Sequence, residues 1–455
     1  MSERCGSGVR SRTSALRPRR YAAAASLTLA ALGSFLGSPG SSGPVLQGRA
    51  AAAAVVEGTA GLTPVLPHTI HRGKPPGAAA LRGVDWSRAR HGELPPPEGL
   101  AVLWQRRIAG GLSGDVLVDD LGRIFATGQG RVLQLGADGR EQYLRRAEFS
   151  SAVASALLAD GQRVVLAREG TLAAWSVDGD LAFRVELQVP AGWTRGDLLP
   201  LPEGSVLVST GSWLVWVSAG GSVEGYTQLK DAVAETLVSG GQAWILTERG
   251  DVLTWDGRSP AVKQGSLAGR ASTGAVRAAG QLLAVLDGRE LVEWSLTTGE
   301  RRSLAHLEGA GASARLSVPN STLVHILGAN GALFSVPLAA TGNADTPPEP
   351  QQLPAGPGEL VSSADGVLAW FVSNAPLTLQ RRNGVTRSLA EVVCAQPSSL
   401  LPAGSGRLLA ACRSGQLWLI GPSAPSAATS DPPVDLGRPD RTPTAPARLP
   451  PISNP

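Results

Sequence analysis

The sequence predicts an all-β protein, an eight-bladed β-propeller of four-stranded antiparallel blades. The first observation is a hairpin phrase, with a turn glycine and a large apolar residue about five positions later, that returns along the whole chain. The second is its spacing, since successive turn positions differ by 40, 41, 39, 38, 43, 43 and 41 residues. A fixed period of about 40 residues with room for four strands per repeat indicates a propeller.

The phrase is clearest in Gly161–Gly179, which reads GQRVVLAREGTLAAWSVDG. A short apolar run precedes a glycine turn, and an Asp-Gly turn follows the tryptophan-bearing strand. The eight copies pair these turn and apolar residues: Gly130 with Leu135, Gly170 with Trp175, Gly211 with Trp216, Gly250 with Trp255, Gly288 with Trp294, Gly331 with Val336, Asn374 with Leu379 and Gly415 with Ile420.

These repeat positions have structural roles. A turn glycine allows φ > 0 between two strands, which a β-branched residue adopts only at a cost. The residue five positions on lies on a blade face, where a tryptophan can cover the apolar surface of the next blade. We therefore interpret the tryptophans as blade packing rather than as a cofactor cage.

Residues 1–42 have the composition of an export signal or an N-terminal anchor. Six arginines and one acid lie between Met1 and Arg20, and an apolar run from Tyr21 to Leu36 and then small residues follow. This apolar run falls short of a comfortable membrane span, which favours a cleaved signal over a retained anchor. Arg19-Arg20 leaves both the Sec and the twin-arginine routes open. Because Cys5 precedes the apolar run, a lipoprotein anchor is not expected.

The whole chain has a net charge of +4, and because this leader carries six arginines and one acid (+5), the rest of the chain is near neutral at −1. A nucleic-acid-binding domain carries a basic face on the folded part, so no nucleic-acid partner is expected. We expect the protein in the periplasm or outside the cell, free or tethered through its N-terminus.

The remaining chain divides by composition. Residues 43–99 are a low-complexity linker expected to be disordered, in which Trp86 either docks on the domain or stays partly exposed. Residues 100–421 form the propeller, and residues 422–455 form a disordered, proline-rich tail. The irregular stretch Thr341–Pro357 is expected as a long rim loop, with or without a binding role.

The strand at residues 101–108 precedes the first complete repeat. The eighth copy, Gly406–Gly421, is followed by a proline-rich stretch and has no fourth strand of its own. An open edge on the last blade is a liability for aggregation. We therefore predict that the N-terminal strand completes the eighth blade and closes the ring.

Two cysteines occur in the exported part, Cys394 and Cys412. In an oxidising compartment they could form a disulfide across the last two blades. They could also be two small core residues on neighbouring strands, because sequence does not place their side chains within bonding distance.

The repeat resembles that of the PQQ-like (quinoprotein-like) propellers. The resemblance rests on LGRIFATGQGRVLQLGADGREQY, GQRVVLAREGTLAAWSVDGDLAFRV and LLAVLDGRELVEWSLTTGERRSL, and it covers roughly residues 100–421. It implies an eight-bladed fold and two kinds of function within the family. One is a dehydrogenase that holds PQQ and calcium in the ring. The other is a non-enzymatic exported scaffold, such as the lipoprotein that assists outer-membrane protein assembly.

No functional residue of the dehydrogenases or of the scaffold proteins can be assigned to a position in this sequence. The chain has neither an adjacent cysteine pair nor a lipoprotein cysteine after the apolar run. The five histidines are scattered, and neither a phosphate-binding glycine loop nor a Gly-x-Ser-x-Gly elbow is present. We therefore assign no catalytic, cofactor-binding or metal residue and no cofactor.

The leading hypothesis is an exported, non-catalytic, monomeric propeller of the non-catalytic branch that binds a protein or cell-envelope component. The alternative is a PQQ-dependent oxidoreductase with its cofactor in the central funnel. Fold alone does not choose between them, because propellers host both kinds of function.

Overall fold

The computed structural model describes residues 92–158, 160–190, 196–201, 203–277, 280–311, 314–320, 322–338 and 348–423. The export signal, Trp86 and the tail beyond residue 423 lie outside this range, as do residues 341–347 of the expected rim loop. The described residues contain no helix long and apolar enough to cross a membrane.

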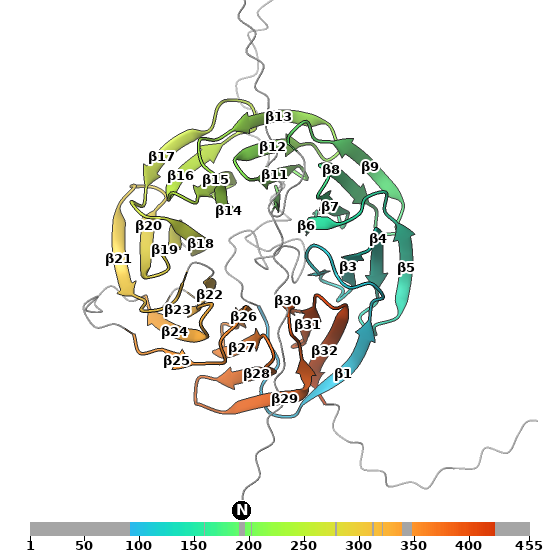
Figure 1. Cartoon of the computed structure of the whole chain (residues 1–455), viewed down its shortest axis with the longest axis vertical. Helices are drawn as coiled ribbons and strands as arrows, with labels where there is room; N and C mark the ends of the chain where they lie inside the picture. Colours follow the sequence, from blue (N-terminus) through green and yellow to red (C-terminus); the bar gives the residue numbers. More distant parts are fainter. Residues whose placement is uncertain are drawn as a thin grey trace, which may run out of the picture. The chain divides into compact units, whose positions relative to one another are not determined.

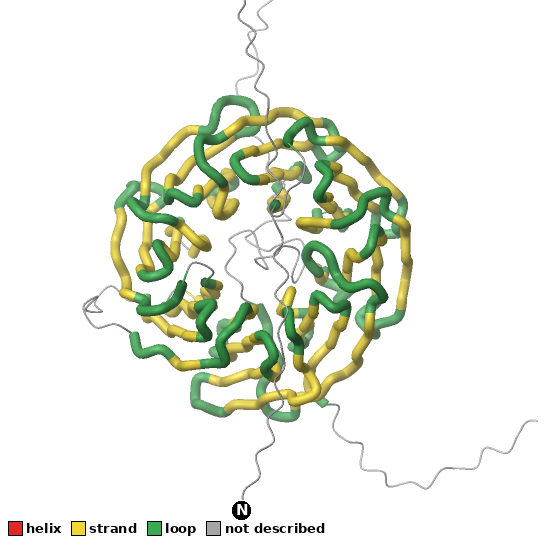
Figure 2. The backbone as a smooth tube through the Cα atoms, in the orientation of Figure 1, coloured by secondary structure: helices red, strands yellow, loops and turns green. Residues whose placement is uncertain are grey.

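The described chain folds into eight four-stranded antiparallel sheets arranged as blades in a ring (Figure 1). In the first seven blades the chain starts at the centre of the ring and steps outward to the rim before it passes to the next blade. Figure 2 shows strands and turns throughout the described ring, without a helix. The predicted eight-bladed propeller is confirmed.

Blades 1 to 4 contain these strands, each blade in order from the centre outward: β2 (Leu117–Val118), β3 (Ile124–Gly128), β4 (Arg131–Leu135), β5 (Glu141–Arg146); β6 (Ala152–Leu157), β7 (Arg163–Ala167), β8 (Thr171–Trp175), β9 (Leu181–Glu186); β10 (Asp197–Pro200), β11 (Val206–Thr210), β12 (Trp213–Val217), β13 (Val223–Gln228); β14 (Val233–Ser239), β15 (Gln242–Thr247), β16 (Asp251–Trp255), β17 (Val262–Ser266).

Blades 5 to 8 contain, in the same order: β18 (Ala271–Arg277), β19 (Gln281–Leu286), β20 (Glu290–Ser295), β21 (Arg301–His306); β22 (Arg315–Asn320), β23 (Leu323–Leu327), β24 (Ala332–Pro337), β25 (Gln351–Gln352); β26 (Gly358–Ser362), β27 (Val367–Val372), β28 (Pro376–Arg381), β29 (Thr386–Val393); β30 (Pro397–Pro402), β31 (Leu408–Cys412), β32 (Gln416–Pro422), β1 (Leu100–Arg107).

The ring closes through strands from the two ends of the propeller. β1 pairs antiparallel with β32, with Leu100 opposite Pro422 and Arg107 opposite Gln416. A register shift between Val102 and Trp104 bends the strand within this ladder. The first strand of the propeller therefore supplies the fourth strand of blade 8. This confirms the prediction that the strand at residues 101–108 completes the eighth blade.

The six turn glycines singled out in the sequence all have positive φ. The values are 65° for Gly130, 100° for Gly170, 54° for Gly211, 80° for Gly250, 84° for Gly331 and 96° for Gly415. Their carbonyls also accept hydrogen bonds from the chain that leaves an outer strand, for example from Ala147 to Gly130 at 2.7 Å. The glycines thus shape the hairpin and anchor the connection to the next blade.

The four tryptophans of the repeat do not all face the same way. Trp175 packs in a cluster with Val132 and Tyr143 of blade 1, and Trp255 and Trp294 likewise face the preceding blade. Trp216 instead faces the following blade, where its ring lies 5.9 Å from that of Trp255.

The cause is the position of the glycine in the preceding hairpin. Gly170 directly precedes β8, so Trp175 is the fifth residue of its strand. Gly211 is the first of the two residues between the paired Thr210 and Trp213, so Trp216 is the fourth residue of β12. A shift of one residue turns a side chain to the other face of a strand. The equal spacing of five residues in the Gly170–Trp175 and Gly211–Trp216 pairs therefore hides two different orientations.

A disulfide joins Cys394 and Cys412, whose Cα atoms lie 5.9 Å apart. Cys394 follows the outer strand of blade 7, and Cys412 ends β31 of blade 8. Both residues are buried. The bond therefore links the last two blades beside the point of ring closure.

Candidate functional site

Two kinds of loop meet at one end of the ring, which we call the loop end. They are the connections from one blade to the next and the hairpins between second and third strands. Hydrogen bonds tie them together, as from Leu187 to the Gly170 carbonyl at 2.9 Å and from Leu267 to the Gly250 carbonyl at 2.8 Å. The other hairpins of each blade lie at the opposite end. A binding surface on such tied loops is held in place by the blades beneath.

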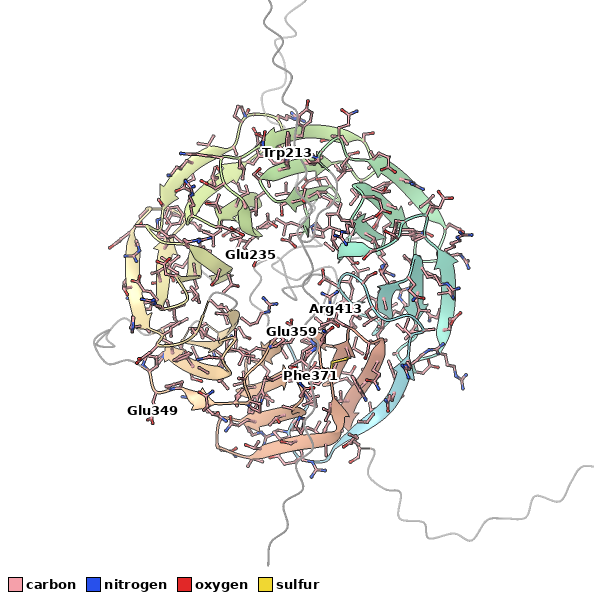
Figure 3. The ribbon with its side chains drawn as sticks, viewed as in Figure 1. Trp213, Glu235, Glu349, Glu359, Phe371 and Arg413 are labelled. Carbon is pink, nitrogen blue, oxygen red and sulfur yellow. A yellow bond between two sulfur atoms is a disulfide. The ribbon has the colours of Figure 1, made fainter. Side chains whose placement is uncertain are left out.

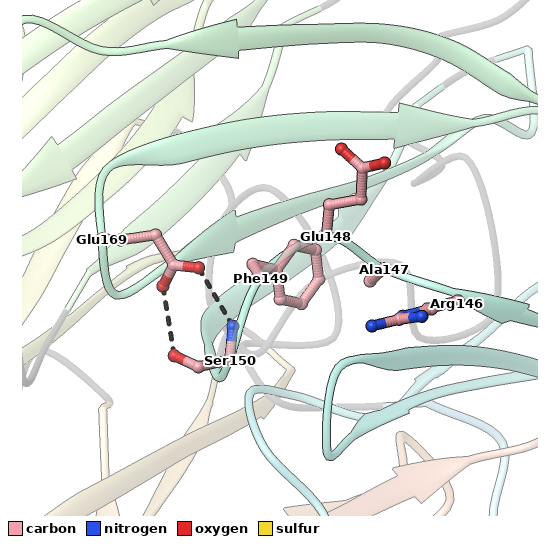
Figure 4. Close-up of a pocket in the computed structure, with 6 residues that line it drawn as sticks. All are labelled: Arg146, Ala147, Glu148, Phe149, Ser150 and Glu169. Atoms are coloured by element: carbon pink, nitrogen blue, oxygen red, sulfur yellow. Dashed lines mark hydrogen bonds between the residues drawn. The ribbon is translucent and has the colours of Figure 1, made fainter.

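The loop end carries a cleft of about 640 Å³ at the junction of blades 1 and 2 (Figure 4). The connection from β5 to β6 supplies most of its lining, and the β7–β8 hairpin supplies the rest. The lining residues are Arg146, Ala147, Glu148, Phe149, Ser150 and Glu169. Both polar and apolar groups therefore face the cleft.

The walls of this cleft are fixed by specific contacts. Glu169 accepts hydrogen bonds from the Ser150 backbone nitrogen at 3.0 Å and from the Ser150 hydroxyl at 3.5 Å. Phe149 is buried, and its ring meets that of Trp175 edge-on, with centroids 6.0 Å apart. The connection is therefore anchored both to the neighbouring hairpin and to the core, which preorganises the cleft.

The charges around the cleft are unequally paired. Glu148 forms an ion pair with Arg184, which also bonds Glu186 at 3.1 Å. Arg146 has no side-chain hydrogen bond or ion pair with any described residue, and it stands directly opposite Arg131 in the β4–β5 ladder. Both arginines are exposed. Like charges directly opposite each other repel, so this pair favours an anionic group brought by another molecule.

A buried cation fastens the same two blades. Arg163, at the start of β7, is fully buried and donates to the carbonyls of Ala126 at 3.0 Å and Leu133 at 3.3 Å, and to the Thr127 hydroxyl. Burial lowers the pKa of this guanidinium to about 10, so it stays protonated at neutral pH. The seam that carries the cleft is therefore held by polar as well as apolar contacts.

The centre of the ring is lined by polar side chains that bridge neighbouring blades. Thr236 donates to Asp197 at 2.6 Å, and Arg315 lies 3.6 Å from Glu359. Figure 3 shows Glu235, Glu359 and Arg413 directed toward the centre. Within the described residues no group of three His, Cys, Asp or Glu side chains lies close enough to hold a metal ion.

This donor set does not match the calcium and quinone site of the alternative hypothesis. The inner-strand acids Asp197 and Glu359 come from different blades, and Thr236 and Arg315 of neighbouring blades engage their carboxylates. A calcium site gathers six to eight oxygen ligands around one point.

None of the sequence-derived positions lines the cleft, and three of them lie beside it. Gly130 and Gly170 belong to the hairpins beside the cleft, and the Trp175 ring packs edge-on against the buried ring of Phe149. The other repeat glycines and tryptophans lie in other blades, and Cys394 and Cys412 lie at the seam of blades 7 and 8. The lining residues themselves were not anticipated, because the Ser150–Glu169 contact joins two blades and leaves no local pattern.

Comparisons with known proteins agree on the architecture. No protein-family model matches the chain, and no curated protein matches it. The solved structures similar to it include BamB from Moraxella catarrhalis, with 17% identity, a TM-score of 0.57, and coverage of 71% of this chain and 97% of that one. The computationally designed protein Ika8 matches with 11% identity, a TM-score of 0.54, and coverage of 69% and 98%. At these identities the likeness shows the propeller fold that the chain shares with them.

Proposed function

We propose that this chain is a non-catalytic propeller that binds a protein partner through its loop end, with the cleft of blades 1 and 2 as the centre of the contact. One observation carries the proposal. The cleft is braced by the Ser150–Glu169 and Phe149–Trp175 contacts, while Arg146 at its edge has no partner among the described residues. A rigid cleft beside an unneutralised cation is suited to recognition.

The partner we propose presents an acidic segment to Arg131 and Arg146. A carboxylate placed between them would relieve their repulsion and form charge-assisted hydrogen bonds, which arginine makes well with two nitrogens at once. The fixed loops lower the ordering cost of association. The likeness to BamB supports the proposal only at the level of the fold.

We further propose that the protein is exported and acts as a monomer in the cell envelope or outside the cell. The Cys394–Cys412 bond supports export, because disulfides persist in oxidising compartments and are rare in a reducing cytosol. The arginine-rich leader and its apolar run support the same location.

The test compares purified full-length baits on an envelope fraction. Wild type should retain a partner that Arg146→Glu loses, and the wild-type complex should weaken as salt is raised, because exposed charges are screened. The matched control is Arg140→Glu, which reverses an exposed arginine of the same blade at the opposite end.

Two results would contradict the proposal. One is a partner retained equally by wild type, Arg146→Glu and Arg140→Glu. The other is dye reduction by the purified protein after addition of PQQ and calcium, which would support the oxidoreductase alternative instead.

A further inference from the structure

A short proline-rich segment docks in the seam between blades 7 and 8 at the end of the ring opposite the loop end. The Gly92 backbone nitrogen donates to the Ser362 carbonyl at 3.0 Å, and Glu98 forms an ion pair with Arg381 at 3.1 Å. Between these two attachments runs Glu93-Leu94-Pro95-Pro96-Pro97. The sequence led us to expect residues 43–99 as a linker, and residues 92–99 of it make these contacts with the propeller.

The contact is built around Leu94. Its side chain is 4% exposed and belongs to an apolar cluster drawn from blade 7, including Val361 and Val367, and from blade 8, including Leu400 and Leu408. Pro95 and Pro97 are also buried, whereas Glu93 and Glu98 are exposed. The seam therefore accepts a leucine followed by prolines and leaves the flanking acids in solvent.

The chemistry is that of polyproline recognition. The ring of each successive proline fixes φ and favours an extended polyproline conformation, so little conformational entropy is lost when such a segment docks. Other domains use this property to bind proline-rich peptides in apolar grooves. Here the groove is filled by the chain's own residues.

The same chain contains a second segment of this kind. Arg448-Leu449-Pro450-Pro451 repeats the order of Leu94-Pro95-Pro96 near the C-terminus. The tail also starts beside the groove, because Ser423 donates from its backbone nitrogen to the Gly99 carbonyl at 2.7 Å and from its hydroxyl at 2.8 Å. An extended polyproline chain rises ~3.1 Å per residue, so the stretch from Ser423 to Leu449 is ample for a return to the seam.

We propose that the seam of blades 7 and 8 is a docking groove for Leu-Pro-Pro segments, filled here by residues 94–97 and open in exchange to residues 449–451. The tail segment lacks an acid at the place of Glu98, where Ser453 stands. It therefore forgoes the ion pair with Arg381, and the N-terminal segment is the preferred occupant. Exchange releases residues 92–98 from the seam and lengthens the free chain ahead of the propeller.

The experiment uses the full-length chain and a fluorescein-labelled peptide of residues 447–455, ARLPPISNP, followed by fluorescence anisotropy. In wild type residues 94–97 fill the groove, and in Leu94→Ala the chain's own tail takes their place. The Leu94→Ala/Leu449→Ala double variant weakens both of the chain's own occupants and so opens the groove to the peptide. The peptide should bind this double variant at least tenfold more tightly than either wild type or Leu94→Ala.

Two controls make the result decisive. A peptide with alanine for leucine, ARAPPISNP, should lose most of its affinity, and GELPPPEGL from the N-terminal segment should bind the double variant more tightly than the tail peptide. A Glu98→Ala/Leu449→Ala chain, altered in the groove only at an exposed side chain, replaces the double variant if that one does not fold, and it should bind the tail peptide more tightly than wild type does but with a smaller gain. Failure of the tail peptide to bind a folded variant, or equal binding of the alanine peptide, would overturn the exchange.

Discussion

At the junctions between several neighbouring blades, a turn glycine of one blade packs against an aromatic ring of the preceding blade. Rings on outer strands of three successive blades, Trp104, Tyr143 and Phe183, each lie under a turn glycine of the next blade, where an added Cβ would come within 3.0 Å of the ring. In blade 3 the corresponding outer-strand residue is Gly225, and Trp216 from the adjacent strand fills the space under Gly257. The inverted orientation of Trp216 thus completes a contact that the outer strand leaves open.

Two glycines of blade 3 test this contact at matched backbone geometry. Gly204 and Gly221 both have φ of 85°, but an added Cβ at Gly204 meets only the Ala219 Cβ at 3.5 Å, whereas at Gly221 it meets the Phe183 ring at 2.5 Å. Alanine at either site should cost about 1 kcal/mol for the left-handed backbone. Gly221→Ala should cost a further ~1–3 kcal/mol for overpacking. Denaturant midpoints measure both, and equal losses would exclude the ring contact.

His325 gives the protein a titration in the acid range. Its side chain is buried in β23, its Nδ1 lies 2.9 Å from the Ser335 hydroxyl, and burial lowers its pKa to about 4. The unfolded chain takes up this proton near pH 6.5, so stability from this residue is complete above that pH and is lost as pH falls toward 4. The loss should approach about 3 kcal/mol.

His325→Gln, which cannot take up the proton, should show a flatter decline between pH 6.5 and 4. Urea unfolding across this range measures the difference from wild type. A wild-type curve parallel to that of the variant would contradict the assignment.

At the scale of elements, the disulfide and the β1–β32 ladder reinforce the same two blades. The bond spans 18 residues of sequence and joins two buried side chains. Constraint of the unfolded chain by a loop of this length typically contributes about 3 kcal/mol. The Cys394→Ala/Cys412→Ala variant should therefore lose about that amount, measured by denaturant unfolding under oxidising conditions. Wild type unfolded under reducing conditions is the control and should match the variant. Equal stability of wild type and variant under oxidising conditions would contradict a contribution from the disulfide.

The sequence predicts those features that recur in every repeat. It does not predict contacts between residues that belong to different blades. The period of about 40 residues predicts eight blades, and the missing fourth strand of the last copy predicts closure by residues 101–108. The repeat spacing does not predict the face of Trp216, because Gly211 precedes its strand by two residues whereas Gly170 precedes its strand by one. Leu94 and the Ser150–Glu169 contact gave no signal, since each depends on residues brought together only by the folded ring.

At the scale of the whole molecule, closure makes the ring cooperative. Each blade leaves its faces open until its neighbours cover them, so stability depends on the unbroken circle of seams. Deletion of residues 100–107 removes β1 and exposes β32 as an edge. The deleted chain should lose its single cooperative thermal transition and become prone to association. A control chain that lacks only residues 430–455 should melt like wild type, and a β1 deletion that also does so would contradict closure.

The most direct measurement for the proposed function is site-specific photo-cross-linking in the intact envelope. Benzoylphenylalanine replaces either Glu148, an exposed lining residue of the cleft, or Arg140 at the opposite end of the ring. We expect a defined protein adduct from position 148 that disappears when Arg146→Glu is added, and no such adduct from position 140. The same adduct from both positions, or an adduct at 148 that survives Arg146→Glu, would contradict a partner held at the cleft of blades 1 and 2.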